Sequence, residues 1–297
     1  EEDRAIGSAL LDRPGTRWWC MLGNAKRWKG EELRLEKDGH TLTAVRIDQH
    51  DGEHLIEFRW NGEETFIQQL DRFGAVPLPP YMRRSAEADD DTRYNTIFGE
   101  HPGSVAAPTA SLHFTLAVMQ ALATKGIDTA RVTLHVGAGT FLPVKSETMQ
   151  GHDMHSEQVR IPRQAIRLLR ERIGKGPIIP VGTTALRTIE SLYWFGADIA
   201  NGADPQALQV QQWRPYADAP DVAPDAALAA VLHWLDRHGL DAVTGSTTLL
   251  IAPGYRFRLT DALVTNFHQP RSTLLLLVAA LIGPQWREVY AHALNSG

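Results

Sequence analysis

The fold is decided by residues 178–194, which read IIPVGTTALRTIESLYW. A short apolar run at 178–181 passes through the loop 182–184 into a helical pattern at 185–194. A buried strand that leads directly into a helix is typical of α/β folds, in which helices cover a sheet on both faces. Ligands in such folds bind at the carboxyl ends of the strands. The sequence therefore predicts an α/β fold with a binding loop at 182–184.

The alternation of strand and helix continues on both sides of this stretch. Two further loops of small, polar or histidine residues, 137–140 and 265–268, also follow predicted strands. We expect these two loops and the loop 182–184 to form one pocket at an edge of the sheet. The other predicted strands are residues 132–136, 159–161, 247–251 and 262–265, and the other predicted helices are 116–124, 163–173, 225–238, 273–282 and 286–294.

A run of small residues at 103–113 ends on His113, at the entrance of the predicted helix 116–124. Small side chains let a ligand approach the backbone closely, and Pro108 stiffens the path. Thr115 is placed to cap the first amide groups of the helix. An ordinary loop leading into a helix has the same composition. We interpret the run as a binding loop because of the similar loops further along the chain.

The first part of the chain has a different pattern. Short runs at 18–22, 32–36, 41–47, 54–60 and 65–67 are separated by turn residues. The Asp-Gly and Asn-Gly pairs between them are strong hairpin signals, because both residues tolerate a positive φ. We predict a small β-barrel domain at 1–75 and a large α/β domain at 76–297. The second begins with a proline-rich, acidic linker at 76–102.

Composition limits the class of protein. A formal net charge of −5 and a pI near 6.2 disfavour a protein that coats nucleic acid by bulk charge. The single Cys20 excludes an internal disulfide, and the apolar run at 274–282 is too short to span a bilayer. We therefore expect a cytoplasmic protein with no membrane role. In residues 196–245 we identify no candidate catalytic or binding residues.

The loops contain motifs whose order and spacing cover most of residues 6–294. They are PLPPY at 77–81, GSVAAPTASLHFT at 103–115, HVGAGTFLPV at 135–144, HDMHSE at 152–157, VGTTALRTIES at 181–191, PGYRF at 253–257 and TNFHQPRSTLL at 265–275. Together they resemble the S-adenosylmethionine:tRNA ribosyltransferase-isomerase (QueA) family of the queuosine pathway. That family's opening Asn-Asp-Thr-Arg run and its closing Arg-Phe-Phe-Ser-Tyr-Gly-Asp run are not found. We therefore expect that segments of the family are missing from both ends of this chain.

The resemblance implies a three-layer α/β domain with a small β-barrel domain inserted. It also implies a reaction in which the ribosyl part of S-adenosylmethionine moves to 7-aminomethyl-7-deazaguanine in a tRNA anticodon. The product is epoxyqueuosine, and adenine and methionine leave. The donor is consumed, so it is a substrate and no cofactor is expected. The implied partners are S-adenosylmethionine and the tRNA that carries the precursor base, and we expect a monomer.

This chemistry needs a base, an acid and a group near the cationic sulfonium. The candidate acid and base residues are His113, His155 and His268, and Glu157 is a candidate carboxylate near the sulfonium or a base. Each of them could instead be a hydrogen-bonded structural side chain. For the methionine carboxylate the candidates are Thr183, Thr184 and Arg187, and for other substrate contacts Ser104, Thr109, Tyr255, Thr265 and Asn266.

Basic residues suggest a tRNA surface. Arg163, Arg167 and Arg170 recur at helical spacing and present one basic face, although a solvated helix face has the same spacing. We expect them to grip phosphates together with Arg160, Lys26, Arg27 and Lys29.

Two other functions compete with this interpretation. A metal-dependent hydrolase would use His152, His155 and Glu157, with His113, His135 and His268 completing the site. The helical histidine spacing and the cysteine ligands of common zinc sites are missing, so we predict no metal. A non-catalytic RNA-binding protein would use the barrel and keep the α/β part as a scaffold. Release of adenine from S-adenosylmethionine distinguishes both from the ribosyltransferase.

Overall fold

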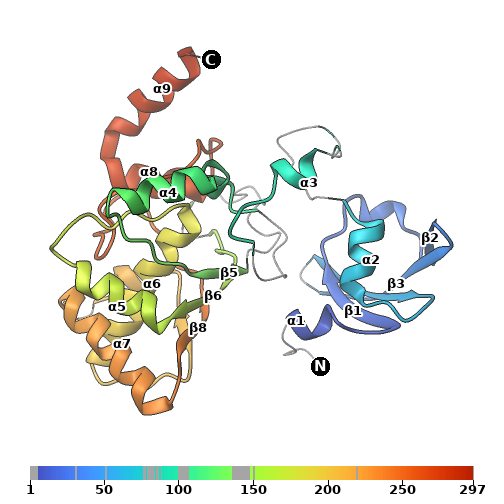
Figure 1. Ribbon diagram of the computed structural model, residues 1–297, viewed down its shortest axis with the longest axis horizontal. Coiled ribbons are helices and arrows are strands. Elements are labelled where there is room, and N and C mark those ends of the chain that lie inside the picture. Colours follow the sequence, from blue (N-terminus) through green and yellow to red (C-terminus); the bar gives the residue numbers. More distant parts are fainter. Residues whose placement is uncertain are drawn as a thin grey trace. The chain divides into compact units, whose positions relative to one another are not determined.

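The computed structural model describes residues 6–30, 32–50, 52–75, 78, 84, 87, 89–99, 107–135, 148–149, 151–218 and 220–296. The chain divides into two compact units, each with its own four-stranded sheet (Figure 1). Unit 1 comprises Glu1–Thr92 and His101–Gly103, and unit 2 comprises Arg93–Glu100 and Ser104–Gly297. The protein is therefore a mixed α/β protein with two sheets. The predicted boundary between residues 75 and 76 stays a prediction.

Unit 1 is an antiparallel sheet with one helix packed on it. The strands follow the order β1-β4-β3-β2. Between β2 and β3, Asp38 and Gly39 have φ values of 50° and 78°, as the predicted hairpin turn requires. The ring of Phe66, which opens α2, lies 5.2–5.7 Å from the rings of Trp18, Phe58 and Trp60. The elements of unit 1 are α1 (Ile6–Ala9), β1 (Gly15–Cys20), η1 (Ala25–Arg27), β2 (Leu33–Lys37), β3 (His40–His50), β4 (Glu53–Trp60) and α2 (Phe66–Phe73), and α3 (Asp90–Arg93) follows at the border with unit 2.

One predicted strand of unit 1 is wrong. Residues 65–67 begin the helix α2, and the Thr65 backbone N–H donates to Gln68 Oε1 at 2.8 Å. This reciprocal cap turns a short β-like run into the first turn of a helix, because it satisfies an amide that the helix leaves unpaired. The other four predicted strands are confirmed. The strand order places β1 and β2 at the two edges of the sheet, so closure into a barrel stays a prediction.

The sheet of unit 2 has the order β5-β6-β8-β7. Strands β5 (Thr133–His135), β6 (Glu157–Pro162) and β8 (Ala242–Thr247) pair antiparallel, and β7 (Leu208–Val210) pairs parallel with β8. The sheet is therefore mixed. The predicted strand 247–251 is wrong beyond its first residue, because β8 ends at Thr247.

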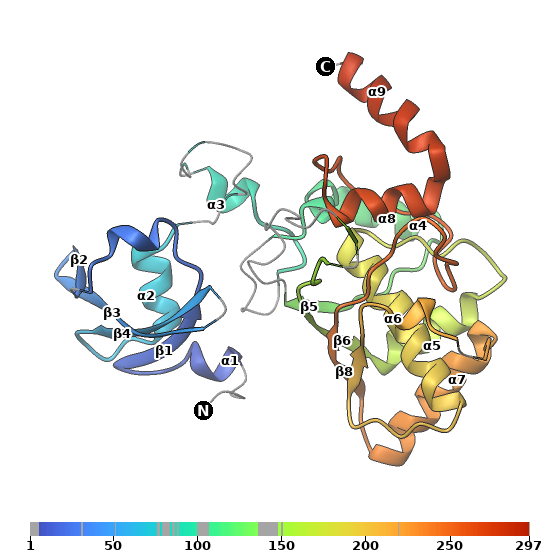
Figure 2. The same cartoon turned by 180° about the vertical axis from the view of Figure 1, so that it is seen from behind.

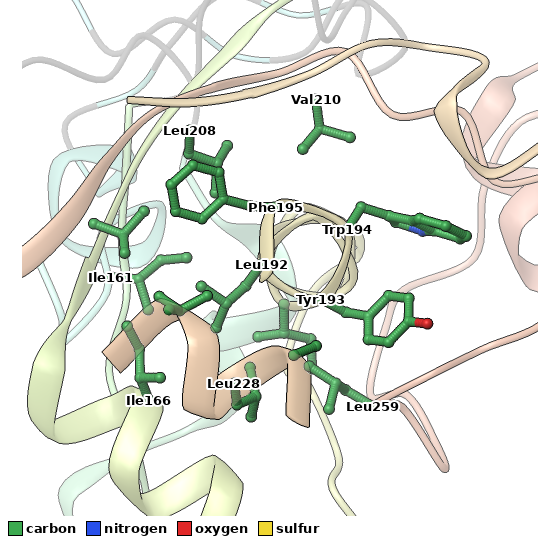
Figure 3. Packing of buried hydrophobic residues seen from close by; sticks show 14 of the residues in the cluster. Ile161, Ile166, Leu192, Tyr193, Trp194, Phe195, Leu208, Val210, Leu228 and Leu259 are labelled. Carbon is green, nitrogen blue, oxygen red and sulfur yellow. The ribbon is translucent and has the colours of Figure 1, made fainter. Parts of the chain in front are cut away.

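The core of unit 2 is built around α6 (Thr183–Ala200), which is buried on nearly all sides through most of its length. Figure 3 shows Leu192 and Phe195 of this helix packed with residues of β6, β7 and neighbouring helices. The flanking helices are α5 (Arg163–Arg172), which begins after Pro162 as predicted, and α7 (Pro224–His238). Gly196 permits the close approach of α6 and α7, since a Cβ there would lie 2.3 Å from the Ala227 carbonyl oxygen. Each fully buried large apolar side chain stabilises such a core by about 1.5–3 kcal/mol.

The apolar run at 178–181 does not form a buried strand. It lies alongside 261–264 and is joined to it by one parallel bridge, Val181 to Val264. The Asp261 N–H donates to the Ile178 carbonyl and the Val264 N–H to the Pro180 carbonyl, both at 3.0 Å. Ile179 is 48% exposed. The pairing is short because Pro180 has no N–H to contribute to a longer ladder.

The remaining predicted helices are confirmed. They are α4 (Leu116–Thr124), α8 (Thr273–Ile282) and, after the turn η6 (Gly283–Gln285), α9 (Trp286–Ser296), which extends away from unit 2 (Figure 2). As predicted, Thr115 caps α4, and its Oγ1 accepts from the Val118 N–H at 3.3 Å. Although the run 274–282 is apolar throughout, only Leu277 and Val278 of α8 are buried. By length and composition alone, Thr273–Ser296 would fit a membrane span, which is weak support for one.

Candidate active site

Two of the predicted loops meet at the parallel bridge between Val181 and Val264. Gly182 and Thr265 are the residues that directly follow the bridge on its two sides. The Gly182 N–H donates to the Val264 carbonyl at 2.8 Å, with Gly182 at a φ of 98°. Because the bridge is parallel, loops 182–184 and 265–268 leave it at the same end. The predicted juxtaposition of these two loops is confirmed.

The turn η3 (Thr109–His113) contacts both of these loops. A Cβ on Gly182 would lie 3.9 Å from the Ala110 Cβ, so the turn packs against the loop 182–184. His113 Nε2 lies 2.8 Å from Asn266 Oδ1. An amide oxygen only accepts, so His113 donates from Nε2 and, when neutral, carries its lone pair on Nδ1. The predicted loop 137–140 lies outside the described residues.

Glu157 is the centre of a buried polar network. It is the first residue of β6 and is 1% exposed. Its Oε1 lies 3.1 Å from His155 Nε2 and accepts from Thr184 Oγ1 at 3.4 Å. Its Oε2 lies 3.1 Å from Nη1 of Arg187, which is 2% exposed. Three predicted site residues therefore converge on one carboxylate, His155 from the segment before β6 and Thr184 and Arg187 from the beginning of α6.

The charges in this network determine the protonation of Glu157. Burial by itself raises the pKa of this carboxyl, but Arg187 and then the hydrogen bond from His155 more than offset it and hold the pKa below its ordinary value. Glu157 is therefore ionised at neutral pH. Arg187 also donates from Nε to the Leu249 carbonyl at 3.0 Å. A buried guanidinium facing a buried carboxylate balances its charge and holds its position.

His268 differs from the other two histidines. Burial lowers the pKa of His268 to about 4, so the ring is neutral at pH 7. Its Nε2 lies 3.0 Å from Thr265 Oγ1, and its backbone N–H donates to the Tyr290 hydroxyl at 3.0 Å. A neutral ring that is held through Nε2, on a backbone that is also held, is suited to hydrogen bonding. It is a poor source of a proton, because its charged form is rare.

The predicted substrate-contact residues fall into three groups. Thr183, Thr184 and Thr265 lie in the two bridged loops, Asn266 contacts His113, and Thr109 opens η3. Tyr255 is buried, and its hydroxyl donates to Glu190 Oε2 at 2.8 Å and accepts from Trp194 Nε1 at 3.0 Å. This geometry favours a structural role for Tyr255, and its substrate contact stays a prediction. Ser104 lies outside the described residues.

Sequence reasoning missed the function of Glu190. This residue is 0% exposed, and its carboxylate accepts from the backbone N–H groups of Arg258, Leu259 and Thr260 at 2.9–3.0 Å and from the Tyr255 hydroxyl. It thereby anchors the segment that leads into the loop 265–268. The available signal was a charged residue in an otherwise apolar helix, because a buried charge must be paired. The same signal applies to Arg187 on that helix.

The predicted basic face on α5 is partly neutralised. Arg170 pairs with Asp225 at 2.8 Å, and Arg163 pairs with Asp236, both carboxylates being on α7. Arg160 and Arg167 are exposed and have no carboxylate partner in the part of the chain that the structure describes. The same is true of three exposed cations in unit 1. These are Lys26, Arg27 and Lys29, next to or within η1.

A metal site is not found among the described residues, where no three His, Cys, Asp or Glu side chains form a group able to hold an ion. A hollow of about 590 Å³ at the end of α6 is lined by Phe195, Asp198 and Gln209, among others, and by none of the predicted site residues. Its lining offers no acid and base pair, since Asp198 is paired with Arg214. We therefore place the candidate site at the bridged loops.

Comparison with known proteins gives matches over the whole chain. Residues 1–297 match the family model described as queuosine biosynthesis protein. The S-adenosylmethionine:tRNA ribosyltransferase-isomerase of Cereibacter sphaeroides is 44% identical over 283 residues, which are 94% of this chain and 68% of the relative. The enzyme of the same name from Methylocella silvestris is 39% identical over 290 residues, 95% of this chain and 68% of the relative. A crystal structure of S-adenosylmethionine tRNA ribosyltransferase from Thermotoga maritima is 23% identical and covers 96% of this chain and 71% of that one, with a TM-score of 0.39.

Proposed function

The chain belongs to the S-adenosylmethionine:tRNA ribosyltransferase-isomerase family of queuosine biosynthesis, and from this premise we propose how its residues serve the reaction. It is a tRNA-modifying transferase and isomerase. We propose that it moves the ribosyl part of S-adenosylmethionine to 7-aminomethyl-7-deazaguanine in the anticodon and forms epoxyqueuosine. Adenine and methionine leave, and the donor is consumed, so no cofactor is proposed.

His155 is the proposed base. The positive sulfonium makes a neighbouring C–H acidic, and a positioned base removes that proton. Glu157 is ionised and accepts from His155 Nε2 at 3.1 Å, so the neutral ring carries its lone pair on Nδ1. The carboxylate also stabilises the imidazolium that forms when the ring takes the proton. This contact with a buried carboxylate is the observation that carries the proposal, because it combines a base with the group that orients it.

His113 is the proposed acid for the departing adenine. It is exposed, and Asn266 holds its ring through Nε2 at 2.8 Å. The imidazolium form can therefore donate from Nδ1 to a ligand nitrogen. His268, in the same loop as Asn266, remains a neutral hydrogen-bonding group, because burial keeps its pKa near 4.

The methionine carboxylate is proposed to bind at the beginning of α6. The backbone N–H groups there point out of the helix, and its dipole favours an anion. Thr183 and Thr184 add hydroxyls in the first turn. Arg187 is 2% exposed and faces Glu157. This supports a role for Arg187 in positioning the Glu157 carboxylate in preference to binding the substrate directly.

The finer features implied by the family complete the proposal. Unit 1 would close into a small barrel, and unit 2 would form a three-layer α/β domain. The enzyme would work as a monomer in the cytoplasm. Gel filtration with light scattering tests the monomer.

Release of adenine tests the proposed function. We expect adenine to form from S-adenosylmethionine only when tRNA carrying 7-aminomethyl-7-deazaguanine is present. The matched control is the same tRNA with guanine at that position, which lacks the 7-aminomethyl group that acts as the nucleophile. Chelators should leave the rate unchanged. Tight tRNA binding without adenine release would instead support a non-catalytic RNA-binding protein, and a rate that falls with chelation would support the hydrolase.

The surface of α5 allows a matched test of tRNA contacts. We expect Arg167→Gln to weaken tRNA binding roughly fivefold and to reduce the salt dependence by about one phosphate contact, because its charge is uncompensated. Arg170→Gln, less than one turn away, should change binding less than twofold, since Asp225 already neutralises Arg170. Fluorescence anisotropy at several salt concentrations measures both. Unchanged binding in Arg167→Gln would remove this face from the tRNA surface, and equal weakening in both variants would show that Asp225 does not neutralise Arg170 toward tRNA.

A further inference from the structure

Phe267 is an exposed aromatic ring in the loop that forms the candidate site. Its side chain is 62% exposed. The two residues beside it face the site. Asn266 contacts His113 at 2.8 Å, and His268 contacts Thr265 at 3.0 Å. A single exposed apolar residue is common on protein surfaces, so the place of this ring between two residues of the candidate site is what makes it informative.

The ring is held in place by α9. Phe267 meets Tyr290 edge to face, with ring centroids 5.0 Å apart and planes at 89°. Tyr290 in turn meets Trp286 at 5.7 Å and accepts a hydrogen bond from the His268 N–H at 3.0 Å. The loop and the helix therefore share one aromatic cluster, which we call the Phe267 cluster (Phe267, Trp286 and Tyr290). A fixed ring loses little conformational freedom when it binds a flat ligand.

Two cations lie beside this cluster in the sequence. Arg271 follows Phe267 by four residues, and Arg287 lies over the Trp286 ring at 4.9 Å. Both are exposed, and neither has a carboxylate partner within the described ranges. An exposed ring, one arginine four residues along the chain and a second arginine over another ring of the cluster match the chemistry of unpaired nucleic acid, in which bases stack on aromatic rings and phosphates bind cations.

We infer that Phe267 stacks on the target nucleobase of the tRNA after that base leaves the anticodon stack, with Arg271 and Arg287 contacting the adjacent phosphates. The inference deepens the proposed function and rests on it. An apolar peptide is a poorer fit, because Phe267 lies between two polar site residues in the sequence and Arg287 lies over the Trp286 ring of its cluster. Stacking also supplies a surface on which the base can stay while its aminomethyl group reacts.

The test compares two anticodon stem-loop RNAs that differ only at the target position. One carries the precursor base, and the other carries an abasic nucleotide. For the unchanged chain we expect the base to strengthen binding about tenfold, in line with the usual worth of one base stacked on an aromatic ring. Phe267→Ala and Phe267→Leu should both remove this difference. Phe267→Trp should keep it, because it keeps a ring, and binding of the abasic RNA should change less than twofold in every variant.

A matched control is Trp213→Leu, which removes another exposed aromatic ring that packs on a tyrosine, Tyr216, outside the site loops. It should leave the tenfold difference intact. The inference is overturned if Phe267→Leu binds the base-bearing RNA as the unchanged chain does, since apolar contact alone would then suffice. It is also overturned if Phe267→Ala weakens both RNAs equally. Circular dichroism shows whether each variant is folded. Failure of the proposed function can be distinguished from failure of this inference, because the unchanged chain would then release no adenine.

Discussion

Glu157→Gln is expected to lower kcat/KM for adenine release by a factor of about 10²–10⁴, which is the usual contribution of a positioned acid or base. The substitution keeps the size of the side chain but removes the charge that orients His155 and stabilises its protonated form. It also offers an amide N–H₂ where His155 and Arg187 now find an acceptor. Single-turnover kinetics with precursor-bearing tRNA measure the loss.

The control for this variant is Glu190→Gln on α6. Glu190 is also a fully buried carboxylate, but its partners are backbone N–H groups and Tyr255. We expect Glu190→Gln to lower the free energy of unfolding while kcat/KM of the folded enzyme falls less than tenfold. Equal losses of kcat/KM in the two variants would show that Glu157 is only a structural carboxylate.

Arg187→Met is expected to lower the free energy of unfolding by about 3–5 kcal/mol at pH 7, the usual result of removing one partner of a buried ion pair. The methionine fills similar space but leaves Glu157 charged and buried. Urea denaturation measures the change. The double variant Glu157→Gln/Arg187→Met should be destabilised by less than the sum of the single variants, because no buried charge remains without a partner. Additive effects would show that the two side chains are not coupled.

The pH dependence of stability should also change in Arg187→Met. In the unchanged chain the pKa of Glu157 is held below its ordinary value of 4.5, so the carboxylate stabilises the fold above that pH. This contribution is lost as the pH falls through the lowered pKa. Without Arg187, burial raises the pKa of Glu157, and the fold is instead penalised as the pH rises through the raised value. The destabilisation by Arg187→Met should therefore be small near pH 4 and largest near pH 7.

Several features of the fold follow from local sequence, and the errors have local causes. Helices α4, α5 and α7 begin and end close to where their caps and apolar spacing predict, because those signals lie within a few residues of each other. The strand predicted at 65–67 failed because a capping box outweighed a short β-like run. The strand predicted at 178–181 failed because Pro180 limits the pairing to one bridge.

The family, the reaction and the loops of the candidate site could be predicted without a structure, because they depend on motifs that are contiguous along the chain. The tertiary structure alone decided which charges are available. Arg163 and Arg170 are neutralised by α7, and Arg187 is buried against Glu157. Each of these pairs joins residues that are about 30 to 73 positions apart in the sequence. Burial and long-range pairing determine pKa and accessibility, and neither can be inferred from spacing along one helix.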